Sequence, residues 1–179
     1  MSITINPPPG PWTVDDLERI PDGGFRIEIH EGNLVLMSPA TMWHADVARR
    51  IANALLAAGR VASNEVGVKK SDRSTRIADV AVFKERPENR KMAFWHPDDL
   101  ALVVEVVSES SKDDDRFIKP RWYARAGIAE YWRVEEAADD QDEAIIITYK
   151  LTSTADGEQQ YLQTGATTLA MLESPEARI

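Results

Sequence analysis

Cysteine is absent from this 179-residue chain, and histidine occurs only three times. Without thiols the protein has no disulfides, no thiolate zinc site and no cysteine nucleophile. So few imidazoles also argue against a metal site built mainly from histidine. Any metal ion is therefore expected to be a hard cation with oxygen ligands, such as Mg²⁺, Mn²⁺ or Ca²⁺.

Long apolar runs are also missing. The most apolar segment, residues 100–107, carries Glu105 in its middle and falls far short of the roughly 18 residues typical of a membrane span. The N-terminus lacks the order of a signal peptide, in which basic residues precede an apolar stretch. These features predict a cytoplasmic protein without a membrane partner.

Positive charge is scarcer than negative charge. The chain has 21 Lys and Arg against 30 Asp and Glu, which gives a net charge of −9. Residues 134–179 hold ten acids and two bases, whereas residues 1–133 hold twenty acids and nineteen bases, so the body is almost neutral. This balance argues against a non-specific coat on DNA and leaves a local nucleic-acid contact open.

The remaining composition, 43% hydrophobic and 28% charged, is that of an ordinary globular protein and excludes a disordered chain. The length suits one domain with a sizeable core. Because Pro7-Pro-Pro-Gly-Pro11 favours extended backbone, we expect a lead-in over residues 1–11, one domain over 12–170 and a tail over 171–179.

Hydrophobic periodicity predicts both helices and strands. Thr13 with Asp16 indicates the capped start of a short helix that Pro21-Asp-Gly-Gly24 ends. Further helices are expected over 42–58 and up to residue 126, and strands over 25–29, 34–37, 61–68, 76–83, 101–107, 131–134, 144–150 and 160–162, with loops over 69–75 and 84–99. This order predicts an α/β or α+β fold, in which helices flank a mixed central sheet and a β-hairpin lies at the N-terminus.

Two carboxylates occur inside apolar strands, where propensity does not favour them. Asp79 lies in Ile77-Ala-Asp-Val-Ala-Val-Phe83, and Glu105 lies in Leu102-Val-Val-Glu-Val-Val107. A buried carboxylate costs several kcal/mol unless it is paired, protonated or bound to a cation. A divalent metal between the two acids satisfies this requirement. The alternative is that each acid bonds to backbone amides or pairs with an arginine such as Arg76 or Arg121.

Lys119 is the third candidate for a site. It precedes Pro120 and the helical run 121–126, for which Asp114 or Asp115 is a plausible N-cap. A cation in the first turn is unfavourable relative to the helix dipole, and a nearby phosphate or metal-bound hydroxide would offset that cost. A solvated surface lysine is the alternative.

The motifs around these residues resemble the Uma family of restriction-endonuclease-like proteins and, at greater distance, the PD-(D/E)xK nuclease superfamily. The resemblance covers about residues 12–135. It is carried by Asp79-Val-Ala-Val82, Leu102-Val-Val-Glu-Val-Val-Ser108, Asp115-Arg-Phe-Ile-Lys119, Trp122-Tyr-Ala-Arg-Ala-Gly-Ile128 and Glu130-Tyr-Trp-Arg-Val134, together with Arg26-Ile-Glu-Ile-His-Glu-Gly-Asn-Leu-Val35, Ser38-Pro39 and His44.

The resemblance implies a restriction-endonuclease-like fold and an endonuclease that uses Mg²⁺ or Mn²⁺ to hydrolyse phosphodiester bonds of DNA. It implies that Asp79 is the aspartate of the PD motif, with Ala78 in place of proline, and that Glu105 is the acid of the second motif. The lysine expected two residues later is Val107. By the same resemblance, Lys119 supplies the amine from the helix.

The mechanism expected from these roles places the metal on Asp79, Glu105 and the backbone carbonyl of Val106. Lys119 would orient a water or neutralise charge on the phosphate. By the same resemblance, Glu28 matches the acid that the superfamily often places on its first core helix or, in this family, on the N-terminal hairpin. It is a further catalytic candidate that would help to hold a second metal ion, although its alternation with Phe25, Ile27 and Ile29 is also typical of an exposed strand acid.

His44 falls on the apolar stripe of its helix, which suits a packing or capping residue better than a catalytic base. We keep it as a possible accessory residue. The aromatic residues of the same C-terminal motifs, Trp122, Tyr123, Tyr131 and Trp132, are expected in the core because aliphatic neighbours surround them.

Candidate nucleic-acid contacts come from two basic stretches, and a solvated face is the alternative for each. They are Lys69, Lys70, Arg73, Arg76 and Arg116. DNA and a divalent cation are the expected partners, and a homodimer is possible. Two other functions stay open: a catalytically inactive nuclease fold that binds nucleic acid, which Val107 and the acidic balance favour, and a protein-interaction module that uses the acidic segment 135–143.

Overall fold

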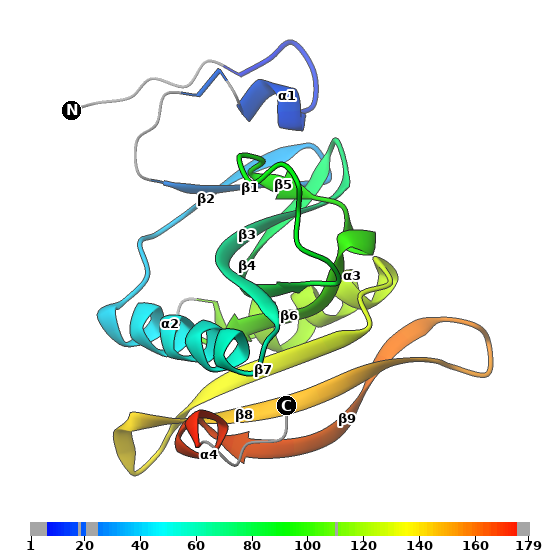
Figure 1. Cartoon of the computed structure of the whole chain (residues 1–179). Coiled ribbons are helices and arrows are strands. Elements are labelled where there is room, and N and C mark those ends of the chain that lie inside the picture. The colour runs from blue at the N-terminus through cyan, green and yellow to red at the C-terminus, as the bar shows by residue number, and fades with distance from the viewer. Residues whose placement is uncertain (1–6, 18, 21–24, 110, 175–179) are drawn as a thin grey trace.

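A seven-stranded mixed sheet forms the centre of the protein in the computed structural model (Figure 1). The structure describes residues 7–17, 19–20, 25–109 and 111–174. The strand order is β5-β3-β4-β6-β7-β8-β9, and a separate two-stranded hairpin, β1-β2, precedes it in the chain. Neighbouring strands are antiparallel except in the pairs β3–β5 and β6–β7, which are parallel. The predicted mixed α+β architecture with an N-terminal hairpin is therefore confirmed.

The bounds of the elements agree with most of the predicted ranges. The helical elements are α1 (Val14–Leu17), α2 (Met42–Ala57), the 3₁₀ turn η1 (Pro97–Asp99), the π-helical turn η2 (Asp114–Ile118), α3 (Lys119–Arg125) and α4 (Leu169–Glu173). The strands are β1 (Arg26–His30), β2 (Asn33–Met37), β3 (Val61–Ser71), β4 (Ser74–Phe83), β5 (Phe94–Trp95), β6 (Leu100–Val106), β7 (Glu130–Ala137), β8 (Asp140–Ser153) and β9 (Gln159–Thr168).

Helices cover both faces of the large sheet and create two apolar layers. The stripe Val47, Ile51 and Leu55 of α2 packs with α4 residues against one face of β4, β6 and β7. On the other face, α3 contributes Trp122 and Tyr123 to the second layer. Burial of both faces explains why the sequence of β6 is almost continuously apolar.

The helices of the described residues include none with the length and apolar character of a membrane span.

The hairpin β1-β2 turns at Glu31 and Gly32, which both have positive φ, as a two-residue hairpin turn requires. It packs against β4, and one hydrogen bond between them runs from the backbone N–H of Ile29 to Thr75 Oγ1 at 2.9 Å. Alternation predicts that Phe25 faces the core and Glu28 faces away, and this is wrong. Phe25 is 52% exposed, whereas Glu28 is 1% exposed, because the hairpin covers this part of β4.

Four other expectations about local structure need correction or fall outside the described residues. The basic stretch 69–75 is the tight end of the β3–β4 hairpin rather than a loop, and the loop 84–99 contains β5 and η1. The tail predicted from residue 171 begins inside α4, where Leu172 is buried. The stop predicted at Pro21-Asp-Gly-Gly24 lies outside the described residues.

One ion pair ties the C-terminal helix to α2. Arg50 donates from Nε and Nη2 to the two carboxylate oxygens of Glu173, at 2.8 and 2.7 Å. These hydrogen bonds lower the pKa of Glu173 below its ordinary value. Since the lowered pKa belongs to the folded state, the pair stabilises the fold above the unfolded pKa of Glu, about 4.3, and loses this effect as the pH falls through the lowered value.

We therefore expect Glu173→Gln to lower the free energy of unfolding by about 0.3–1 kcal/mol at pH 7, because the pair is partly exposed. The difference from the wild type should shrink as the pH falls below about 4. Urea unfolding across this pH range measures it, with the exposed Glu136→Gln as the control. A difference that grows towards low pH would contradict this assignment.

Candidate functional site

Asp79 and Glu105 lie opposite each other on adjacent strands. The antiparallel register of β4 and β6 pairs Val80 with Val104, so the next pair of positions is Asp79 and Glu105. Residues that face each other across an antiparallel pair project to the same face of the sheet. The two acids singled out in the sequence are therefore brought together.

Asp79 is 4% exposed and accepts three hydrogen bonds or ion pairs. Arg26 Nη2 lies 3.0 Å from Oδ1, and both His44 Nε2 (3.1 Å) and the backbone N–H of Val106 (2.8 Å) reach Oδ2. Burial alone would raise the pKa of Asp79, but the His44 hydrogen bond and the charges of Lys119 and Arg26 outweigh it and hold the pKa well below its usual value. This carboxylate is ionised at neutral pH.

Glu105 is fully buried, and each of its oxygens has a partner. Lys119 Nζ lies 2.8 Å from Oε2, and the Tyr123 hydroxyl donates to Oε1 at 2.5 Å. The alternative to a metal site, in which backbone amides or an arginine bind each acid, is therefore found in part. An arginine and a backbone amide bind Asp79, but the arginine is Arg26 rather than Arg76 or Arg121.

Lys119 is 2% exposed, so the alternative of a solvated surface lysine is wrong. Its ammonium contacts Glu105 and, at 2.9 Å, Asp115 Oδ1. Burial would lower the pKa of Lys119, but the surrounding charges of Glu105, Asp115, Asp79 and Glu28 raise it above its ordinary value. Lys119 is therefore a permanent cation at the centre of the acidic side chains.

The backbone around Lys119 differs from the predicted helix start. The chain first makes the π-helical turn η2, and α3 begins at Lys119 with Pro120 in its first turn. Neither Asp114 nor Asp115 caps a helix: Asp115 lies within η2, where it bonds to the Ser111 hydroxyl and pairs with Lys119. The carbonyl oxygen of Asp115 also accepts a hydrogen bond from Tyr131, at 2.8 Å, which fixes the turn against β7.

Glu28 contributes a third buried acid, from the hairpin. Its Oε1 accepts the backbone N–H of Ile77 at 2.7 Å, and its Oε2 lies 2.6 Å from His30 Nε2 and 3.8 Å from Arg76 Nε. The burial of the carboxylate favours its neutral form, but the His30 hydrogen bond and the charge of Lys119 outweigh this and lower the pKa of Glu28.

Four carboxylates and three permanent cations thus share one buried region. The carboxylates are Glu28, Asp79, Glu105 and Asp115, and the cations are Arg26, Arg76 and Lys119. Burial raises the pKa of Glu105 and of Asp115 above their ordinary values, whereas hydrogen bonds and nearby cations lower the pKa of Asp79 and of Glu28. Positive charge close to Glu105 and Asp115 therefore favours their ionised forms.

The donor set suits a hard cation. Mg²⁺ commonly binds through one or two carboxylates and completes its shell with water and substrate oxygens, and Asp79 and Glu105 offer two such groups from rigid strands. Among the described residues, no group of three or more acidic or histidine side chains is arranged as a metal site on its own. The oxygens of both acids already accept hydrogen bonds, so a cation would exchange with protein donors.

The five cations predicted to contact nucleic acid do not share one environment. Lys69, Lys70 and Arg73 belong to the β3–β4 hairpin end, where Lys69 pairs with Asp72 at 2.8 Å. Arg116 pairs with Glu135 at 2.7 Å on η2. Arg76 is 6% exposed and stacks its guanidinium over Trp122 at 5.3 Å, so it is a core residue rather than a surface contact.

Sequence reasoning missed three residues of the site. Asp115 and Tyr123 lie four residues before and after Lys119, and this spacing on a helix was a signal that the three side chains share a face. Arg26 lies two residues before Glu28 and so on the same face of β1. His44, expected to pack or cap, bonds to Asp79 instead.

Comparisons with known proteins identify the family and the fold of the chain. The family model Uma2, described as "Putative restriction endonuclease", matches residues 14–176. A similar solved structure is the crystal structure of a putative nuclease belonging to DUF820 from Anabaena variabilis ATCC 29413, with 18% sequence identity, a TM-score of 0.59 and 86% of each chain covered. At this identity the likeness concerns the fold. No curated protein matches the chain.

The burial of Lys119 among carboxylates leads to a stability prediction. Lys119→Met keeps the aliphatic stem but leaves Glu105 and Asp115 without their cation, so we expect the free energy of unfolding to fall by about 3–5 kcal/mol. Adding Glu105→Gln should restore part of this loss, because one uncompensated charge disappears. Urea unfolding measures both, and exposed Lys150→Met, as control, should stay within about 0.5 kcal/mol of the wild type. A loss below about 1 kcal/mol for Lys119→Met would contradict the ion-pair geometry.

Proposed function

Because the chain belongs to the Uma2 family of putative restriction endonucleases, we propose that it is a nuclease that hydrolyses phosphodiester bonds of DNA with the help of a divalent cation. The observation that carries this proposal is the juxtaposition of Asp79 and Glu105 on adjacent strands, with the ammonium of Lys119 on Glu105 at 2.8 Å. The three side chains come from β4, β6 and α3 and lie on a rigid sheet.

Asp79 and Glu105 would hold the cation, together with the carbonyl oxygen of Val106, and Mg²⁺ or Mn²⁺ suits these ligands. When bound, such an ion polarises a phosphate and lowers the pKa of a bound water. Neighbouring groups of the protein set the charge and the orientation of Asp79 before a cation binds. Hydrogen bonds from Arg26, His44 and the Val106 amide keep Asp79 ionised and fix its orientation.

Lys119 takes the place of the motif lysine. At the expected position stands Val107, which is buried and apolar. The ammonium of Lys119 reaches Glu105 from α3 instead, so the charge is present although its backbone position differs. Since its pKa is raised, Lys119 stays protonated and acts as a cation and hydrogen-bond donor on the phosphate, not as a general base.

The other buried groups support the site. Glu28 is a further catalytic candidate, and its contacts with Ile77 N–H and His30 also tie the hairpin to β4. We assign His44 an accessory role, because it orients Asp79 rather than facing solvent. The proposed partners are DNA and the cation, and a homodimer stays the prediction made from the sequence.

A second candidate is a nucleic-acid-binding protein without hydrolytic activity. The full pairing of Asp79 and Glu105 with protein donors favours it, because these contacts satisfy both acids without a cation. The two candidates differ in one measurable respect, since only the nuclease needs an ion on these carboxylates.

The test is cleavage of plasmid and linear DNA by the purified protein in Mg²⁺, Mn²⁺ or EDTA. Asp79→Asn and Glu105→Gln keep the size of each side chain but remove the charge, and each should lower the cleavage rate by about 10²-fold or more. Calorimetric titration with Mn²⁺ should show binding to the wild type and weaker or no binding to Glu105→Gln.

Glu136→Gln is the matched control, because Glu136 is an exposed acid of β7 away from the site. Full cleavage by Asp79→Asn would overturn the site assignment. DNA binding in EDTA without cleavage in any metal would replace the nuclease with the second candidate.

A further inference from the structure

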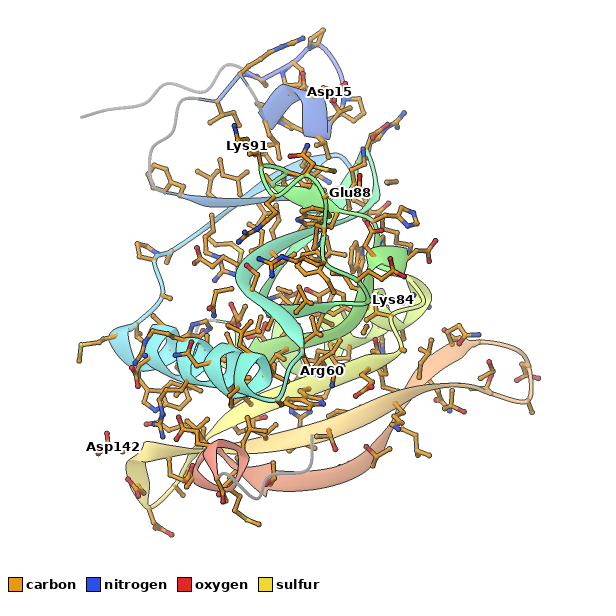
Figure 2. The ribbon with its side chains drawn as sticks, viewed as in Figure 1. Asp15, Arg60, Lys84, Glu88, Lys91 and Asp142 are labelled. Atoms are coloured by element: carbon orange, nitrogen blue, oxygen red, sulfur yellow. The ribbon has the colours of Figure 1, made fainter. Side chains whose placement is uncertain are left out.

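A cavity of about 640 Å³ lies beside the acidic site. The end of α2, the outer edge of β3 and the segment 84–95 line it and leave one side open, and Figure 2 marks Arg60 at the end of α2 and Lys84, Glu88 and Lys91 along that segment. Pockets of about 300–1,000 Å³ are typical of sites for small organic groups. This cavity is therefore large enough for one nucleotide.

Aromatic side chains line one wall of the cavity. Phe94 and Trp95 are half-buried, and Trp95 packs edge-on against Phe83 with 4.9 Å between ring centroids. Phe94 lies directly over Gly67, where an added Cβ would clash with the Phe94 ring and with the Ala93 carbonyl oxygen. The absence of a side chain at residue 67 thus lets β5 and its ring approach β3.

Positive charge lines the same cavity. Arg60, Arg86 and Arg90 all contribute to its lining, and among the described residues none of them forms a salt bridge. Glu65 is the acidic residue of the described lining. Three arginines without carboxylate partners, beside exposed ring surface, match an anion that carries a flat ring.

The cavity and the acidic site share a wall. Glu65 lies opposite Asp79, between the pairs Asn64–Val80 and Val66–Ala78, and has a positive φ of 51°. Its carboxylate lies 3.9 Å from Arg26 Nε, and the same guanidinium donates to Asp79. One side chain, that of Arg26, therefore connects the lining of the cavity with Asp79 of the acidic site.

We propose that this cavity binds an unpaired nucleotide of the strand that the protein cuts, with the base against Phe94 and Trp95 and its phosphates on Arg60, Arg86 and Arg90. The inference rests on the proposed function and specifies the substrate. A base can enter this open-sided cavity and contact Phe94 and Trp95 only when it leaves the stack of a duplex, so single-stranded DNA, or a duplex with an unpaired nucleotide, should bind better than a fully paired duplex.

Fluorescence anisotropy in EDTA tests the proposal without the need for cleavage. The probes are a labelled single strand, its perfect duplex and the same duplex with one unpaired nucleotide. The single strand and the interrupted duplex should bind at least about tenfold more tightly than the perfect duplex. Arg86→Gln with Arg90→Gln should weaken single-strand binding by about tenfold or more.

Trp95→Leu should weaken single-strand binding by about 5- to 100-fold, the range expected for loss of base stacking. The exposed arginine substitutions keep the test valid if Trp95→Leu fails to fold. The matched control is Arg121→Gln, which removes the same charge from a second cavity beside α3. It should change the dissociation constant by less than about twofold, within the usual effect of a surface substitution.

The outcomes separate this inference from the proposed function. Equal affinity for perfect and interrupted duplexes, or cavity variants that bind like the wild type, would overturn the nucleotide site, whatever the cleavage assay shows. A single-strand preference that the cavity variants lose would support the site even if no DNA is cut. Competition by a free nucleoside monophosphate as strong as by the single strand would overturn the assignment to a DNA strand.

Discussion

The ammonium of Lys119 holds the centre of the molecule together. It joins Glu105 on β6 to Asp115 on η2, and its charge also acts on Asp79 of β4 and Glu28 of the hairpin. Buried carboxylates on four separate elements tolerate one another because this cation lies among them. The arrangement of sheet, hairpin and α3 is therefore an electrostatic requirement as well as a result of apolar packing.

The sequence was sufficient for elements whose pattern is local. Alternation and helical stripes predicted the hairpin, α2 and the central strands, and two acids inside apolar strands indicated the site. It was insufficient where a distant element covers a residue. The sequence around Glu28 predicts an exposed acid, because no neighbouring residue indicates that β1 packs on β4. Arg26 was missed for the same reason, since its partner Asp79 is far away in the chain.

The two proposed functional regions meet at one irregular point of the sheet. Glu65 adopts a left-handed conformation, which costs a non-glycine residue roughly 1 kcal/mol or more, beside the strand position of Asp79. This irregularity of β3 at Glu65 lies between the acidic site and the aromatic cavity. A regular β3 would leave Glu65 in the ordinary ladder, so the irregularity couples the shape of the cavity to the environment of the acid.

The π-helical turn η2 makes the number of residues between Ser111 and Lys119 a structural constraint. Each residue of an α-helix rotates the following side chains by about 100° around the axis. Loss of a single residue between Ser111 and Lys119 would therefore rotate the residues before the deletion relative to α3, so Asp115 could not keep both its hydrogen bond with Ser111 and its ion pair with Lys119. Related chains should accept many replacements at the outward positions of this turn and yet admit almost no insertions or deletions within it.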